Sequence, residues 1–188
     1  MHYVIIGSGA AGCSAVEAIR EIDRESRITV ISKDEHPYTP VFLAKYLSGE
    51  IEETQLYYKG VDFFSKLNVN HIKDEVVEVG ESVRLKGGEE IDFDRLLIST
   101  GSKPFIPPIK GVEKKGIFTF QTLDDVRRII QYSKTSRKCA VIGAGPIGLV
   151  AAYALLKIGM EVRVFEALDR ILPAVVDEEI SQMVHQEF

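Results

Sequence analysis

The sequence has 188 residues, of which 45% are hydrophobic and 27% charged, and its 23 basic and 28 acidic side chains give a net charge of −5. This balance is ordinary for a globular α/β protein and leaves no strong basic field, so we expect no nucleic-acid partner. The opening apolar run is only a few residues long before a glycine, which predicts neither a signal peptide nor a membrane span and favours a soluble cytoplasmic protein.

The first motif is the N-terminal stretch Tyr3-Val-Ile-Ile-Gly7-Ser-Gly9-Ala-Ala-Gly12, which predicts a buried strand, a tight turn and a helix start. Gly7 permits the turn, Gly9 lets the backbone approach a pyrophosphate, and Gly12 allows the helix to pack closely on the strand. The helix N-terminus adds free N–H groups and a positive dipole end. The stretch therefore predicts a dinucleotide site, the alternative being a purely structural glycine turn.

A second strand over residues 27–31 completes a βαβ unit, and an acidic ribose ligand is expected at its end. Ser32 and Lys33 occupy the strand end, and Asp34 follows, 22 residues after Gly12. Asp34 is therefore a candidate ribose ligand, with a solvated loop acid as the alternative.

The two cysteines form no CxxC, zinc pattern or disulfide framework, so we expect no metal site. Cys13 falls in the first turn of the predicted helix, where a thiol pKa can drop. A small buried residue is the favoured interpretation of this position.

The middle of the chain is predicted to contain short helices and short strands. Two prolines precede a short helical pattern that ends at Gly49, and a loop and helix follow over residues 54–67. Gly87-Gly88 predicts a hairpin turn between two of the strands. The predicted strands are Val69–Ile72, on which His71 is expected at the surface, Glu75–Val79, Ser82–Leu85, Glu90–Phe93 and a buried strand from Leu96 that ends at Thr100-Gly101. The prolines at positions 104, 107 and 108 then predict a linker.

A second fingerprint follows the linker. Thr122 and Asp125 resemble a capping box at the start of a helix over residues 123–132. The stretch Ala140-Val-Ile-Gly143-Ala-Gly145-Pro-Ile-Gly148 again predicts strand, turn and helix, and Glu166 ends the next strand, 18 residues after the last glycine. A carboxylate there favours NAD over NADP because it accepts ribose hydroxyls and repels a 2′-phosphate. The nearby Arg163 and Arg170 act against that preference.

The two fingerprints lie 136 residues apart, and a pair is far more specific than one. One protein rarely needs two copies of the same cofactor, so the economical interpretation is a flavin dinucleotide and a nicotinamide dinucleotide between which hydride passes. The predicted fold is α/β, with two Rossmann-like dinucleotide-binding folds of three layers around parallel sheets.

These motifs resemble the FAD-dependent pyridine nucleotide-disulfide oxidoreductase superfamily, in the branch of NADH oxidases, nitrite reductase flavin domains and rubredoxin or ferredoxin reductases. The similarity covers essentially the whole chain: both fingerprints, the Pro37-Tyr38 loop leading to Leu47-Ser-Gly49-Glu50, Thr100-Gly101-Ser-Lys-Pro104, and Arg170-Ile-Leu-Pro173. The resemblance implies an FAD-binding domain over residues 1–112 and an inserted NAD(P)-binding domain over 113–188, incomplete at its C-terminus.

The same resemblance implies the residues that bind the cofactors. It implicates Gly7, Gly9, Ala11, Gly12, Ser32, Lys33, Thr100 and Gly101 for FAD, with Val77 through its backbone at the adenine, and Gly143, Gly145, Pro146, Ile147, Gly148 and Glu166 for NAD(P)H, with NADH favoured.

The chain departs from the family pattern near the flavin. Relatives that reduce disulfides carry cysteine at about positions 41–44, where this sequence has none, so neither disulfide reduction nor a cysteine peroxide cycle is expected. Lys45 occupies the place of a flavin-proximal lysine, with a surface lysine as the alternative. The glutamate that partners this lysine in relatives is replaced by Val150.

The chain is also shorter than the family pattern and ends at His185-Gln-Glu-Phe188 in a predicted helix. We therefore expect an FAD-dependent NAD(P)H oxidoreductase unit that passes electrons to a small redox protein, oxygen or a neighbouring subunit. The alternative is a non-catalytic nucleotide-binding subunit, or a fragment that needs a partner chain.

Overall fold

The computed structural model describes residues 1–187 and divides the chain into two compact units. The first comprises Met1–Thr39 and Thr54–Lys103, and the second comprises Pro40–Glu53 and the chain from Pro104 onward. The division after Lys103 falls at the start of the predicted proline linker. Residues 40–53 belong to the second unit, which no sequence pattern indicated. The boundary at residue 112 and the cofactor of each domain stay predictions.

The first unit is built on a parallel sheet with strand order β3-β2-β1-β7. Tyr3 of β1 faces Ile28 of β2 on one side and Arg95 of β7 on the other. Runs of β-branched residues suit these strands, because a parallel sheet is covered on both faces. The strands are β1 (His2–Ile6), β2 (Arg27–Ser32), β3 (Asn70–Lys73) and β7 (Arg95–Ile98).

The prediction of a buried strand from Leu96 was wrong in its burial. β7 is the outermost strand of this sheet and pairs only with β1 among the strands that the structure describes. Leu97 is 39% exposed and Ile98 60% exposed. An apolar strand sequence therefore identified the strand correctly but not its position at the edge.

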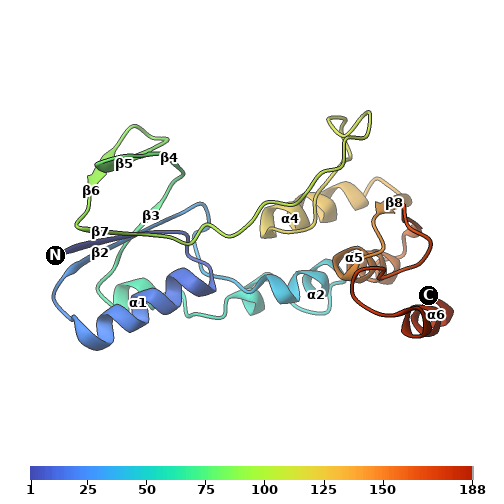
Figure 1. The fold of residues 1–188 in the computed structure, drawn as a ribbon, viewed down its shortest axis with the longest axis horizontal. Coiled ribbons are helices and arrows are strands. Elements are labelled where there is room, and N and C mark those ends of the chain that lie inside the picture. Colours follow the sequence, from blue (N-terminus) through green and yellow to red (C-terminus); the bar gives the residue numbers. More distant parts are fainter. Residues whose placement is uncertain (188) are drawn as a thin grey trace. The chain divides into compact units, whose positions relative to one another are not determined.

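Side-chain alternation along β1 and β2 divides the core of the first unit into two layers. Ile5 and Val30 pack against the helical face, which is formed by α1 (Ala10–Ile22) and α3 (Phe63–Lys66). Val4, Ile6 and Ile31 pack against a small antiparallel sheet on the opposite face. Figure 1 shows α1 on one side of the parallel strands and the small sheet on the other, which makes three layers.

The small sheet is the predicted hairpin region. Its strands run in the order β4-β5-β6, and Gly88, with φ of +91°, lies in the turn between the last two. The strands are β4 (Val76–Val79), β5 (Ser82–Leu85) and β6 (Glu90–Asp92).

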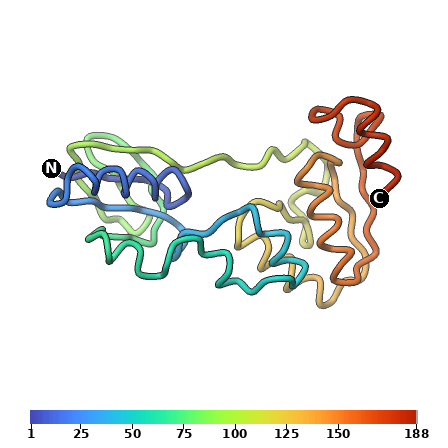
Figure 2. Tube along the Cα trace, turned by 90° about the horizontal axis from the view of Figure 1, so that it is seen from below, coloured from blue at the N-terminus to red at the C-terminus, as the bar shows by residue number. Residues whose placement is uncertain are grey.

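The second unit contains a two-stranded parallel sheet and several helices. Thr122 caps α4 with the predicted capping box, in which its hydroxyl accepts the Asp125 N–H at 3.1 Å and the Asp125 carboxylate accepts the Thr122 N–H at 3.1 Å. α2 packs against both α4 and α5, as the tube in Figure 2 also shows. The elements are η1 (Pro40–Phe42), α2 (Leu43–Leu47), α4 (Leu123–Ser133), β8 (Lys138–Ile142), α5 (Pro146–Lys157), β9 (Glu161–Phe165) and α6 (Glu178–Glu187), and η2 (Glu53–Leu56) begins at the boundary between the units.

A buried arginine fixes the C-terminal end of α1. Arg20 is 9% exposed and donates to three carbonyl oxygens: Leu67 O at 2.7 Å, Asn68 O at 3.0 Å and Asp23 O at 3.0 Å. These bonds join the last turn of the helix to the turn that leads into β3. Asn68 adopts a left-handed conformation, with φ of +51°, at that turn.

We expect Arg20→Met to lower the free energy of unfolding by about 2–3 kcal/mol, because three carbonyls lose a charged donor while the apolar stem is kept. Urea denaturation followed by circular dichroism measures the change. Arg24→Met is the matched control, since Arg24 is exposed on the same stretch of chain. Equal stability of the two variants would contradict the role given to Arg20.

Candidate nucleotide-binding sites

The first glycine loop joins β1 to α1 through contacts that exclude a side chain. Gly7 has φ of +107°, and its N–H donates to Ile31 O at 2.8 Å, so the loop continues the β1–β2 pairing by one residue. A Cβ on Gly12 would lie 2.0 Å from Gly7 O, and one on Gly7 would lie 2.3 Å from Ser99 O. The helix can therefore approach the strand only with glycine at both positions.

The second glycine loop, between β8 and α5, repeats this geometry. Gly143 has φ of +102° and donates to Phe165 O at 2.7 Å, and a Cβ on Gly148 would lie 2.0 Å from Gly143 O. The first helical bonds also match, since Leu149 N bonds Gly145 O at 3.0 Å and Cys13 N bonds Gly9 O at 3.0 Å. Two copies of one local structure thus stand 136 residues apart.

Both loops fit a dinucleotide pyrophosphate. Gly9 and Gly145 are the N-caps of α1 and α5, both are extended, and neither helix has a side-chain cap or an acidic residue in its first turn. A Cβ on either glycine would meet no atom within 4 Å. Uncapped N–H groups beside open space form an anion site. Ala11 and Ile147 are exposed in these first turns, and Pro146 occupies the first turn of α5.

The strand end beside the first loop is more tightly organised than the sequence indicated. Ser32 is 7% exposed, its hydroxyl donates to Asp34 O at 2.8 Å, and it lies 2.9 Å from His71 Nε2. His71 is half-buried and stacks on the Phe64 ring at 4.4 Å between centroids, so the surface position expected for it was wrong. Burial lowers the pKa of His71. Lys33 forms an ion pair with Glu75, the residue directly before β4.

The remaining residues predicted for FAD lie on the strands of the first unit or directly after them. The register of β4 against β5 shifts between Val76 and Glu78, which leaves Val77 without a register partner. Thr100 and Gly101 are exposed after β7, and Gly101 has φ of +70°. The sequence did not indicate Ser99 as part of this site. Its hydroxyl donates to Ile6 O at 3.0 Å and to Gly7 O at 3.2 Å.

Glu166 lies where its side chain reaches the second loop. Its carboxylate accepts the N–H groups of Ala144 at 2.7 Å, Ala167 at 2.8 Å and Leu168 at 3.1 Å. These backbone bonds, with that of Ala144 foremost, lower the pKa of Glu166. The carboxylate therefore stays ionised at neutral pH and touches the glycine loop itself.

The two arginines near Glu166 are both engaged by the protein. Arg170 donates to the carbonyl oxygens of Pro173 at 3.0 Å, Val176 at 2.7 Å and Asp177 at 3.1 Å. Arg163 lies 3.7 Å from Glu161, and its side chain is 75% exposed. Neither contact was predictable from the spacing of the arginines.

Lys45 and Val150 line one small cavity of about 230 Å³ in the second unit. The Lys45 ammonium lies 5.2 Å from the centroid of the Phe42 ring, and it has no ion pair within residues 1–187. A carboxylate is nevertheless present in the same cavity, because Glu50 accepts from Lys157 Nζ at 2.9 Å. The sequence indicated no role for Glu50 or Lys157.

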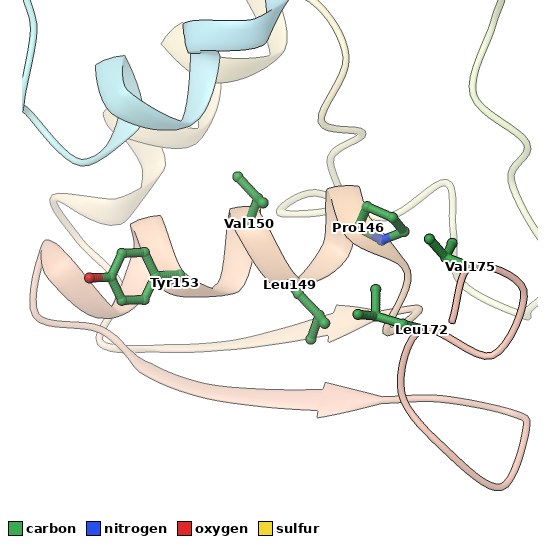
Figure 3. A pocket seen from close by; sticks show the side chains of 6 residues that line it. All are labelled: Pro146, Leu149, Val150, Tyr153, Leu172 and Val175. Atoms are coloured by element: carbon green, nitrogen blue, oxygen red, sulfur yellow. The ribbon is translucent and has the colours of Figure 1, made fainter. Parts of the chain in front are cut away.

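A larger, almost wholly apolar cavity of about 510 Å³ lies along α5. Figure 3 shows Pro146, Leu149 and Val150 on the helix, with Leu172 and Val175 opposite them on the segment after β9. Tyr153 completes the lining and supplies its only hydroxyl. The cavity begins beside the first turn of α5, next to the second glycine loop.

The cysteines are free thiols, and Cys13 is fully buried, as the sequence favoured. Burial raises the pKa of Cys13. Within residues 1–187, no cluster of histidine, cysteine and acidic side chains has the arrangement of a metal site. No helix in that part of the chain is long and apolar enough to span a membrane.

We expect Gly12→Ala to lower the free energy of unfolding by about 3 kcal/mol, because the new methyl would collide with the Gly7 carbonyl. Gly9→Ala is the matched control, because its methyl enters open space and φ at Gly9 is −68°. Thermal unfolding of both variants measures the difference. A loss of stability in Gly9→Ala equal to that in Gly12→Ala would contradict the proposed packing.

Comparisons with known proteins agree with this architecture. The chain is 33% identical to the NADH oxidase of Methanocaldococcus jannaschii, matching 99% of this chain and 44% of that protein. It is 31% identical to the NADH-dependent phenylglyoxylate dehydrogenase subunit epsilon of Aromatoleum evansii, over 99% of this chain and 45% of that protein. The NAD-dependent persulfide reductase of A. fulgidus superposes with a TM-score of 0.90 at 33% identity, over 100% of this chain and 38% of that one.

The chain thus spans less than half the length of each of these relatives. The family described as pyridine nucleotide-disulphide oxidoreductase matches residues 1–188, which is the whole sequence. Together with the two glycine loops and their helices, this match places the chain in the pyridine nucleotide-disulphide oxidoreductase family.

Proposed function

We propose that this chain is an FAD-dependent NAD(P)H oxidoreductase unit that works without a redox-active disulfide. The observation that supports it most is the pair of matching glycine loops, each with an uncapped helix and open space for a pyrophosphate. Members of the family use FAD together with NADH or NADPH. Two different dinucleotides therefore account for both loops.

The first loop, with Ser32, Lys33, Asp34, Val77 and Thr100, is proposed to hold FAD in a domain over residues 1–112. The second loop, with Glu166, is proposed to hold the nicotinamide nucleotide in a domain that begins near residue 113. When bound, FAD supplies the hydride acceptor and passes electrons onward singly or in pairs. The protein's part is to bind and orient both nucleotides. We propose that the protein works in the cytoplasm.

NADH is the proposed donor. Glu166 is ionised and lies at the strand end where an acid accepts ribose hydroxyls and repels a 2′-phosphate. Arg170 donates to three protein carbonyls, so its guanidinium is already occupied. Arg170 therefore gives no support to a preference for NADPH.

Lys45 is proposed as the residue nearest the flavin. Val150 in its cavity leaves the lysine without the carboxylate that would fix its direction, and Glu50 is the acidic group that shares the space. With FAD bound beside it, Lys45 would supply a positive charge near the flavin.

A second candidate function is a nucleotide-binding subunit that needs a complementary chain. One relative is named as a subunit of an NADH-dependent dehydrogenase, and this chain corresponds to 45% of that subunit. The electron acceptor in either case is proposed to be a redox protein, oxygen or a neighbouring subunit.

Anaerobic visible spectra of the FAD-supplemented protein separate the two functions. We expect bound flavin that bleaches on addition of NADH, because both loops are formed. Gly9→Ala should keep its fold and lose flavin, since its methyl fills the pyrophosphate space. Bound flavin that never bleaches would favour the partner-dependent subunit, and a colourless wild-type protein would contradict a self-sufficient reductase.

Glu166→Gln should lower the preference for NADH over NADPH about tenfold, because a charged acceptor is lost and the repulsion of the 2′-phosphate goes with it. Backbone hydrogen bonds hold the pKa of Glu166 in the folded protein below its usual value of 4.5. The carboxylate is therefore charged above that pH, and its effect on the nucleotide preference is lost only as the pH falls through the lowered pKa. Glu166 should therefore stay charged from about pH 8 to about pH 5, and a change in the preference within that range is expected only from the second ionisation of the NADPH 2′-phosphate, at about pH 6.

Fluorescence titration with both nucleotides measures this preference. Glu161→Gln is the control, because Glu161 is exposed at the far end of the same strand and pairs with Lys138. An unchanged preference in Glu166→Gln would remove Glu166 as the discriminating residue.

A further inference from the structure

The segment between β9 and α6 is folded around one guanidinium. Arg170 Nη1 reaches Val176 O and Asp177 O, and Arg170 Nη2 reaches Pro173 O. Three successive parts of the segment are thus held by a single side chain. Because a planar guanidinium offers several donors in fixed directions, no other side chain can hold all three carbonyls in this way.

The segment is also tightly turned within itself. Leu172 adopts a left-handed backbone conformation, with φ of +51°, which is unfavourable for a leucine. Its carbonyl accepts the N–H groups of Val175 at 3.0 Å and Val176 at 3.2 Å. The conformation of Leu172 therefore needs outside support, and the Arg170 bonds on its C-terminal side provide it.

The segment is fixed to α6 both before and after Leu172. Ser181 is 2% exposed, and its hydroxyl donates to Ile171 O at 2.7 Å. The Asp177 carboxylate accepts the Ile180 N–H at 3.0 Å, which caps the first turn of that helix. The segment is consequently anchored on both sides of Leu172.

This anchored segment is hydrogen-bonded to the second glycine loop at one residue. Leu172 N–H donates to Ala144 O at 2.9 Å, and the Glu166 carboxylate accepts the Ala144 N–H at 2.7 Å. Ala144 is 1% exposed and lies between Gly143 and Gly145. Both backbone groups of the loop's central residue are therefore held by the chain that follows β9.

We propose that Arg170 is a positioning residue for the nicotinamide nucleotide: by folding residues 171–177 it holds Leu172 on Ala144 and so fixes the second glycine loop, without contacting the nucleotide. The same fold sets Leu172 and Val175 as one wall of the apolar cavity beside α5. This inference rests on the proposed function, because it assigns the second loop to NADH. It also predicts that Arg170 does not distinguish NADH from NADPH.

The test compares Arg170→Gln and Arg170→Lys with Arg137→Gln, an exposed arginine directly before β8 that serves as the control. Titration with NADH and, separately, NADPH should show both affinities reduced by the same factor of about ten in the Arg170 variants, and unchanged in the control. Lysine keeps the charge but cannot bridge three carbonyls, so it should not restore affinity. A loss confined to NADPH, or no loss, would overturn the proposal.

A second readout needs no nucleotide. Amide hydrogen exchange of Leu172 should speed up at least tenfold in both Arg170 variants, while that of Gly143, which bonds Phe165 O, should not change. Unchanged protection of Leu172 would overturn the positioning role. If the wild-type chain bound neither nucleotide, the proposed function would fail, and exchange at Leu172 would still decide whether Arg170 holds the segment.

Discussion

The close approach of each phosphate helix to its own strand is the constraint on which the rest of the structure depends. The third glycine of each loop lies where a Cβ would be 2.0 Å from the carbonyl of the first. This contact brings the positive end of the helix to the carboxyl edge of the sheet, and the open second glycine leaves room for a pyrophosphate. Because the same contact occurs in both units, the family assignment and the proposed use of two dinucleotides have one physical origin.

The two sites then differ in how the protein surrounds the same loop. At the first, the strand ends in a buried serine that bonds a backbone carbonyl and a half-buried histidine, and the charged Lys33 and Asp34 follow it. At the second, a carboxylate bonds the loop, and a guanidinium folds the segment that follows. The first strand is thus followed by a neutral hydroxyl and only then by charged residues, whereas the second is followed directly by a carboxylate that bonds the glycine loop. Different polar groups at equivalent places can therefore assign different nucleotides to otherwise equal loops.

The sequence predicted well those features that depend on neighbouring residues. Both strand-turn-helix motifs, the capping box of Thr122 and Asp125, and the hairpin turn at Gly88 are local, so residue type and spacing were sufficient. It failed where distant chain segments decide the outcome. The exposure of β7, the contact of Ser32 with His71 and the grouping of residues 40–53 with the second unit all depend on pairings across many residues. The final helix was confirmed up to Glu187, and Phe188 lies outside the described residues.

The segment 40–53 leaves the first unit and forms its ion pairs in the second, with Glu53 bonded to Arg127 and Glu50 to Lys157. The second pair joins residues 107 positions apart in the sequence. During synthesis on the ribosome, Glu50 therefore emerges several seconds before its partner exists, at about 5–20 residues per second. The segment must therefore wait for α4 and α5 to be synthesised before it can form these contacts, whereas the strands of the first unit, which end at Ile98, are already complete.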